Sequence, residues 1–122
     1  MSAISNENII WTIKNGEFDA VQAAFQNDVH KKVNEEIKGR FPVHYAADFG
    51  QLNVLQYLIS LGAEVDIKDK HGITPILAAI WEGHTSCVEL LLNKGANKSG
   101  STPDGQSYLE AAEKDEIKKL LA

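Results

Sequence analysis

The sequence predicts an all-α solenoid of about four short helix–turn–helix repeats joined by short hairpin loops. Two observations predict this fold class. Residues of four types recur with a period of 33, and the apolar residues between them recur at i, i+3 and i+4, the spacing of one helix face. Several positions matched at one period indicate a repeat architecture. The matched positions are Gly39, Gly72 and Gly105, Pro42 and Pro75, Ala46 and Ala79, Gly50 and Gly83, and Leu58 and Leu91.

The most regular unit, residues 72–95, shows why these residue types suit two helices. Thr74 can accept a hydrogen bond from a free N–H group at the start of the first helix. Pro75 suits the first helical position, because its φ is already helical and its missing N–H is not needed there. Gly83 can end this helix in a left-handed conformation. The second helix then has an apolar face made of Val88, Leu91 and Leu92.

The four repeats are expected to form one domain over residues 1–122, with two regular internal repeats and two degenerate capping repeats. In the first, Ser5, Asn6 and Glu7 suit a helix N-terminus, and residues 28–38 form an irregular loop. In the last, Tyr108 replaces proline, and about four residues are missing between the helices. Degenerate ends fit a stack in which each repeat buries its apolar face against its neighbours. The predicted repeats are approximately 3–36, 37–69, 70–102 and 103–122.

The period of 33 and the segments around two prolines resemble the ankyrin-repeat family. The segments are Thr74-Pro75-Ile76-Leu77 and Phe41-Pro42-Val43-His44-Tyr45-Ala46. This resemblance implies L-shaped repeats whose hairpin tips and first helices line a concave face.

Composition and charge narrow the class of partner. The 122 residues are 43% hydrophobic and 24% charged, with a net charge of −5, which is an ordinary composition for a globular domain. A negative balance argues against nucleic acid or an anionic membrane as the main partner, since both require clustered lysine and arginine. It favours a partner with a basic surface. The alternative is that the charge only aids solubility.

The sequence predicts an intracellular protein. A single cysteine, Cys87, excludes an intramolecular disulfide and suits a reducing compartment. The first residues lack a basic stretch followed by an apolar core, so no signal peptide is expected. The longest apolar runs are too short to cross a bilayer. We expect a cytoplasmic monomer that is also present in the nucleus.

No residue pattern indicates catalysis, a cofactor or a metal site. The four histidines show no metal-ligand spacing. His44, in the T-P-L-H-like position, is expected to be a hydrogen-bonding strut between repeats. Cys87 follows His84 by three residues, but no third group orients such a pair, so Cys87 is interpreted as a small, part-buried hydrophobic residue.

Bulky aromatic and acidic residues of the first helices are the candidate binding site. Trp11 and Tyr45 lie five residues before a closing glycine, whereas Trp81 and Glu82 directly precede Gly83. Aromatic anchors beside carboxylates are typical of a binding hot spot for a basic partner. The alternative for Trp11 and Tyr45 is that they only brace neighbouring repeats. The predicted partner-binding residues are Trp11, Tyr45, Asp48, Trp81 and Glu82.

Segments in three repeats are also similar to a small group of non-catalytic ankyrin-repeat proteins. They include Trp11 with Lys14-Asn15-Gly16, His44-Tyr45-Ala46-Ala47-Asp48, Asp69-Lys70-His71, Glu82-Gly83-His84 and Ser86-Cys87-Val88. The similarity implies binding of the heterodimeric actin capping protein, so that filament barbed ends are not capped, and a link to Rel/NF-κB factors. Trp81, where the group has tyrosine, and the tail after Ser99 depart from its pattern. The alternative function is an adaptor for another client, or an inhibitor of a kinase or a Rel/NF-κB-type transcription factor.

Overall fold

The computed structural model describes residues 6–25 and 33–122, and its regular secondary structure within them is entirely helical. Each predicted repeat range contains one pair of helices in these residues, so the all-α repeat fold is confirmed. Ser5 and much of the irregular loop expected over residues 28–38 lie outside the described residues. The helices are α1 (Asn6–Lys14), α2 (Phe18–Ala24), α4 (Pro42–Asp48), α5 (Leu52–Ser60), α6 (Pro75–Glu82), α7 (Thr85–Asn93), α8 (Tyr108–Ala111) and α9 (Asp115–Leu121).

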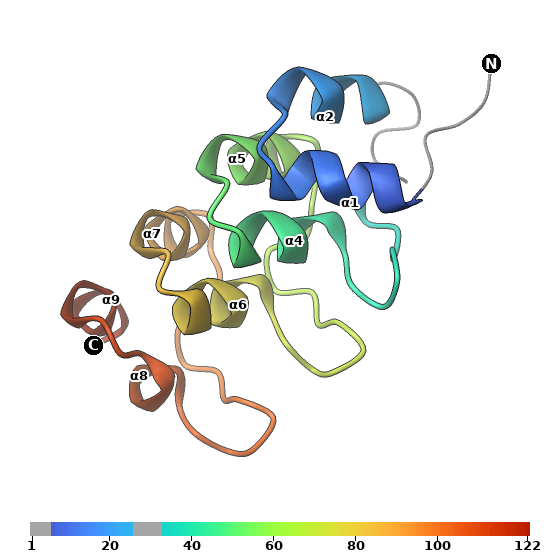
Figure 1. The fold of residues 1–122 in the computed structure, drawn as a ribbon. Coiled ribbons are helices and arrows are strands. Elements are labelled where there is room, and N and C mark those ends of the chain that lie inside the picture. Colours follow the sequence, from blue (N-terminus) through green and yellow to red (C-terminus); the bar gives the residue numbers. More distant parts are fainter. Residues whose placement is uncertain (1–5, 26–32) are drawn as a thin grey trace.

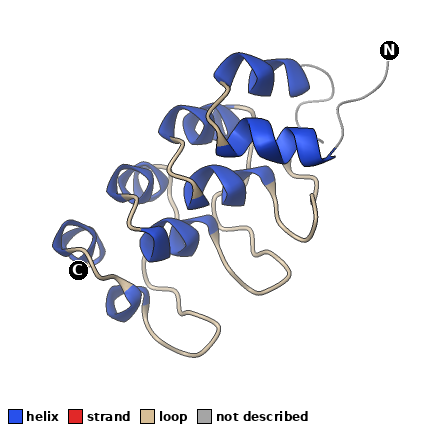
Figure 2. Ribbon diagram, viewed as in Figure 1, coloured by secondary structure: helices blue, strands red, loops and turns tan. Residues whose placement is uncertain are grey.

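The helices form two layers (Figure 1). The first helices of the repeats, α1, α4, α6 and α8, stack on one another, and the second helices, α2, α5, α7 and α9, stack beside them. The loops that lead from one repeat to the next project beyond the first-helix layer (Figure 2). Apolar residues from both layers fill the space between them and are fully buried, among them Ile13, Val43, Ile76, Leu55 and Leu91.

Local signals place the helix ends where the sequence predicts them. Thr74 caps α6, because its Oγ1 accepts a hydrogen bond from Leu77 N at 3.4 Å. Pro75 occupies the first turn of α6, and Gly83 ends the helix with φ of 73°. In α4 the residue before the proline is Phe41, which has no side-chain acceptor. Its N–H donates instead to Nδ1 of His44 at 3.1 Å.

The hairpin turn before α4 is a tight two-residue turn. Ile37 N donates to Arg40 O at 2.6 Å, and Arg40 N donates to Ile37 O at 3.2 Å. Both central residues have positive φ, 53° at Lys38 and 85° at Gly39. This conformation matches the right-handed twist of the flanking chain and therefore favours a compact hairpin tip.

Side chains of each repeat bond to the end of the preceding first helix. Gln51 Nε2 donates to Lys14 O at 2.7 Å, and His84 Nε2 donates to Asp48 O at 3.0 Å. Lys114 Nζ donates to Gly83 O at 2.7 Å. The last carbonyl groups of a helix have no partner within the helix, so these bonds satisfy acceptors that would otherwise depend on water. We call this set of three bonds the inter-repeat ladder.

Candidate functional site

The candidate site is the exposed surface of the first helices, which we call the inner-helix face. It carries Trp11 on α1, Asp48 at the end of α4, Phe49 next to it, and Trp81 and Glu82 at the end of α6. Trp11 is 58% exposed, Trp81 45% and Phe49 43%. Exposed tryptophans are uncommon, so their position on α1 and α6 of one layer, with Phe49 at the end of the intervening α4, marks this surface as a binding candidate.

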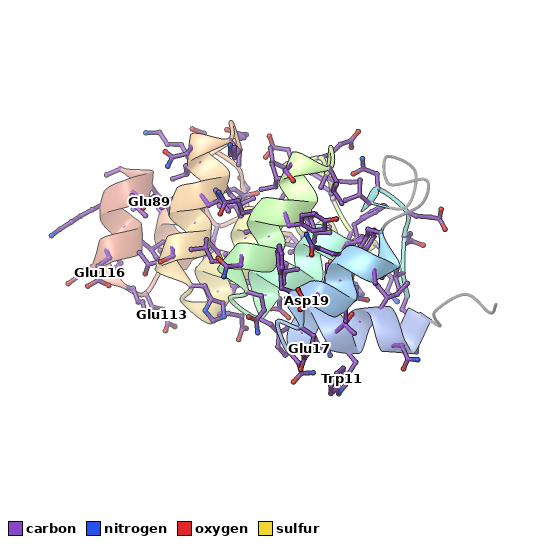
Figure 3. All side chains as sticks on the ribbon, turned by 90° about the horizontal axis from the view of Figure 1, so that it is seen from above. Trp11, Glu17, Asp19, Glu89, Glu113 and Glu116 are labelled. Atoms are coloured by element: carbon purple, nitrogen blue, oxygen red, sulfur yellow. The ribbon has the colours of Figure 1, made fainter. Side chains whose placement is uncertain are left out.

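Trp11 and Tyr45 both line one shallow hollow. The hollow has a volume of about 360 Å³ and is lined by Ile10, Trp11, Lys14, Lys38 and Tyr45. Trp11 points away from the ribbon (Figure 3). The hollow has an aromatic wall and a cationic rim, and its volume suits one large side chain of a partner.

Tyr45 is a buried brace and not an exposed anchor. Its side chain is 6% exposed, and its hydroxyl donates to Ile37 O at 2.7 Å. The guanidinium carbon of Arg40 lies 5.3 Å from the ring centroid, within the range of a cation–π contact. Burial raises the pKa of the Tyr45 hydroxyl. The alternative expected from the sequence is a brace between neighbouring repeats, whereas the hydroxyl bond and the Arg40 contact brace Tyr45 against the hairpin of its own repeat.

Asp48 is partly exposed and paired. Its Oδ2 lies 3.4 Å from Nη1 of Arg40, and the two side chains keep 25% and 22% of their accessible surface. Nε of Arg40 lies 3.3 Å from Oδ2 of Asp69, whose side chain is fully buried. One guanidinium thus contacts a carboxylate at the end of α4 and another in the loop before α6.

Asp69 holds the next hairpin through its other oxygen. Oδ1 accepts hydrogen bonds from His71 N at 2.8 Å and Ile73 N at 3.0 Å. Burial by itself would raise the pKa of the Asp69 carboxyl, but the bonds from the Ile73 and His71 N–H groups, with the charges of His44 and Arg40, outweigh it and lower the pKa. Asp69 therefore stays ionised and fixes the loop before α6.

Trp81 and Glu82 lie one repeat further along the layer. Glu82 is exposed, and within residues 6–25 and 33–122 its carboxylate forms no ion pair. Phe49 occupies the matching position in the second repeat, and Nζ of Lys14 lies 4.7 Å from its ring centroid. The inner-helix face thus has two lysines, Lys14 and Lys38, in the hollow beside Trp11, and a carboxylate that is unpaired among the described residues, Glu82, beside Trp81.

His44 and Cys87, for which the sequence predicts no catalytic role, are part of the packed interior. His44 is fully buried and its Nε2 donates to Ile73 O of the next repeat at 2.7 Å, which confirms the strut. Cys87 is buried, and burial raises the pKa of its thiol to about 11. The described residues contain no cluster of potential metal ligands. None of the helices in that part of the chain is long and apolar enough to span a bilayer.

Sequence reasoning missed Arg40 and Phe49. A signal for Arg40 was present, because the position one period later is Ile73, so the arginine replaces an apolar residue. Its two acidic contacts are 8 and 29 residues away and could not be paired from spacing alone. Phe49, which lies 33 residues before Glu82, was not among the predicted contacts.

The comparisons agree with this architecture. Residues 9–102 match the family model for ankyrin repeats, in three copies. Myotrophin of Xenopus tropicalis is 48% identical over 120 residues, which are 97% of this chain and 99% of that protein. The probable 26S proteasome regulatory subunit p28 of Saccharomyces cerevisiae is 30% identical over 85% of this chain, which spans 46% of that protein. A 26S proteasome non-ATPase regulatory subunit 10 from Dictyostelium discoideum is 33% identical over 75% of this chain and 40% of its own length.

Proposed function

Because the chain belongs to the ankyrin-repeat family, and is related to myotrophin over almost its whole length, we propose that it is a non-catalytic module that binds the heterodimeric actin capping protein. Ankyrin repeats bind proteins, and this broader role follows from the family. The identity of the partner rests on the similarity to myotrophin. In this proposal the chain prevents capping protein from capping the barbed ends of actin filaments, and so regulates actin assembly.

The single observation that carries a binding role is the pair of exposed tryptophans on the inner-helix face. Trp11 and Trp81 have no role in the core that would explain exposures of 58% and 45%. Large aromatic side chains contribute much of the free energy of binding when a partner buries them. Glu82 beside Trp81 and a net charge of −5 favour a basic partner surface.

The proposed mechanism is a steric and electrostatic block. The tryptophans would be buried against the partner, while carboxylates of the inner-helix face pair with its lysine or arginine residues. An interface of ordinary size covers about 800 Å² on each partner. Occupying the basic surface that engages the filament then prevents capping without any chemical step.

The test is actin elongation from barbed ends in the presence of capping protein. The chain should restore elongation, and a double variant, Trp11→Ala with Asp48→Lys, should restore much less. A matched control combines Leu52→Ala with Glu116→Lys, which removes an exposed apolar side chain from α5 and reverses an acidic charge on α9, both outside the inner-helix face. Unchanged binding of the Trp11 and Asp48 variant would show that the face is wrong. No effect of the unmodified chain at about micromolar concentration would reject capping protein as the partner.

The second candidate is an adaptor for another client, such as a kinase or a Rel/NF-κB-type transcription factor, and the ankyrin family alone favours it. It predicts binding through the same tryptophans but no restored elongation. With either partner, we propose that the chain acts as a monomer in the cytoplasm, with nuclear presence if a transcription factor is bound.

A further inference from the structure

Arg40 is the residue through which the inner-helix face is connected to two hairpins. It ends the two-residue turn that begins at Ile37, and its side chain then lies over the ring of Tyr45 on α4. From there the guanidinium reaches Asp48 at the end of α4 and Asp69 in the next hairpin. A planar guanidinium can donate in several directions at once, which a lysine ammonium on a flexible stem does less well.

The contacts of Arg40 divide the carboxylates of the face into two kinds. Asp48 is paired with Arg40 at 3.4 Å, and Asp69 is fully buried behind it. Glu82 is exposed and, among the described residues, has no cationic partner. A cation does lie nearby, because Nζ of Lys114 donates to the O of Gly83, the residue after Glu82. Within the part of the chain that the structure describes, a basic side chain arriving from solution therefore meets an unpaired carboxylate at Glu82 and a paired one at Asp48.

We propose that Arg40 is the positioning residue of the inner-helix face and pairs with Asp48, so that Glu82 beside Trp81 supplies the carboxylate that a basic partner binds. The part about the partner rests on the proposed binding of capping protein. The part about Arg40 and Asp48 concerns the isolated chain and does not depend on any partner.

The first experiment is a double-mutant cycle on the isolated chain. Arg40→Gln, Asp48→Asn and the double variant are unfolded in urea. If the pair is formed, the two substitutions are coupled by about three- to tenfold in the folding equilibrium constant. Hydrogen exchange at the His71 and Ile73 amides should also speed up in Arg40→Gln, because Asp69 then loses its cation. Arg40→Lys should restore the coupling only in part. Additive effects and unchanged exchange would overturn the positioning role.

The second experiment measures the rate at which capping protein associates with each variant at low salt. Glu82→Gln should slow association by about three- to tenfold, and Asp48→Asn should change it less than twofold. In the Arg40→Gln background the Asp48 carboxylate is released, so adding Asp48→Asn should then slow association clearly. Lys94→Gln, which removes a positive charge from the end of α7, is the control for the net-charge change in Arg40→Gln.

The outcomes separate the two proposals. If Asp48→Asn slows association as much as Glu82→Gln, and equally in both backgrounds, Arg40 does not compensate Asp48 and the inference is wrong. If the unmodified chain does not bind capping protein, the proposed function fails, while the urea cycle and hydrogen exchange still decide the role of Arg40.

Discussion

The hydroxyl of Tyr108 lies 2.7 Å from Oγ1 of Thr74, the residue that caps the first helix of the preceding repeat. Both side chains are buried. Tyr108 occupies the position at which the two internal repeats have proline, and its ring fills the space beside Gly100, where a Cβ would lie 2.6 Å from the ring. The shortened last repeat is thus attached by an aromatic side chain that reaches back to a helix cap.

Tyr108→Phe is expected to lower the free energy of unfolding by about 1–2 kcal/mol. The substitution keeps the ring but removes the partner of a buried hydroxyl. Urea unfolding followed by circular dichroism measures the change. Tyr57→Phe, on a half-buried ring that packs edge-on against Phe18, is the control and should change stability by less than about 0.5 kcal/mol. Equal effects of the two substitutions would rule out a special role of the bond to Thr74.

Gly50→Ala is expected to destabilise the chain more than Gly72→Ala. Both glycines have positive φ, 68° and 77°, so both substitutions strain the backbone by about 1 kcal/mol. A Cβ on Gly50 would also lie 2.5 Å from Nδ1 of His84, whereas one on Gly72 would have nothing within 4 Å. The additional loss of stability in Gly50→Ala, relative to Gly72→Ala, should be smaller in a chain that also carries His84→Ala, because the imidazole that the new Cβ would meet is then absent. A similar loss at both glycines would contradict the close approach of His84.

Stability is expected to fall as the pH drops below about 6.5 because of His44. Burial lowers the pKa of its imidazole below 6.5, although the hydrogen bond to Ile73 opposes this. On acidification the unfolded chain therefore binds the proton first. The contribution of neutral His44 to the free energy of unfolding is complete above pH 6.5, and it is lost as the pH falls toward the pKa of His44 in the folded chain. The limiting slope for one proton is about 1.4 kcal/mol per pH unit.

Urea titrations at about pH 7.5 and about pH 5.5 measure this linkage. In His44→Gln, most of the difference in the free energy of unfolding between the two pH values should disappear, whatever the substitution does to stability at the higher pH. Asp69 acts in a lower window, since its pKa is held below 3.8 and its contribution is lost only as the pH falls from that value. A pH dependence that is the same with and without His44 would assign the linkage to another group.

Cys87 is expected to react slowly with a thiol probe while the chain is folded. The thiol is buried on α7 and its pKa is raised to about 11, so little thiolate exists near neutral pH. Labelling should become fast in urea, with the free-cysteine rate as the reference. Fast labelling of the native chain would reopen the pairing of Cys87 with His84 as a reactive site.

Much of the fold could be predicted because its signals are local. Thr74, Pro75 and Gly83 determine helix ends through their own backbone and side-chain chemistry, and the period then transfers the assignment to the other repeats. The candidate site was harder to predict. Trp81 was expected to be outside the core and is exposed, but Tyr45 at a matching position to Trp11 is buried. The difference arises from Arg40 and Ile37, which cover Tyr45 from a hairpin whose geometry one sequence does not reveal.

The inter-repeat ladder has a direction. Gln51, His84 and Lys114 each satisfy a carbonyl group that precedes them by 37, 36 and 31 residues, so the donor always comes later in the chain than the acceptor. During synthesis, the end of each first helix leaves the ribosome well before the side chain that completes it. Removing residues from the C-terminus would leave the previous helix end open to water, whereas removing them from the N-terminus would leave only a mobile donor without its acceptor. Truncation from the two ends should therefore be tolerated unequally.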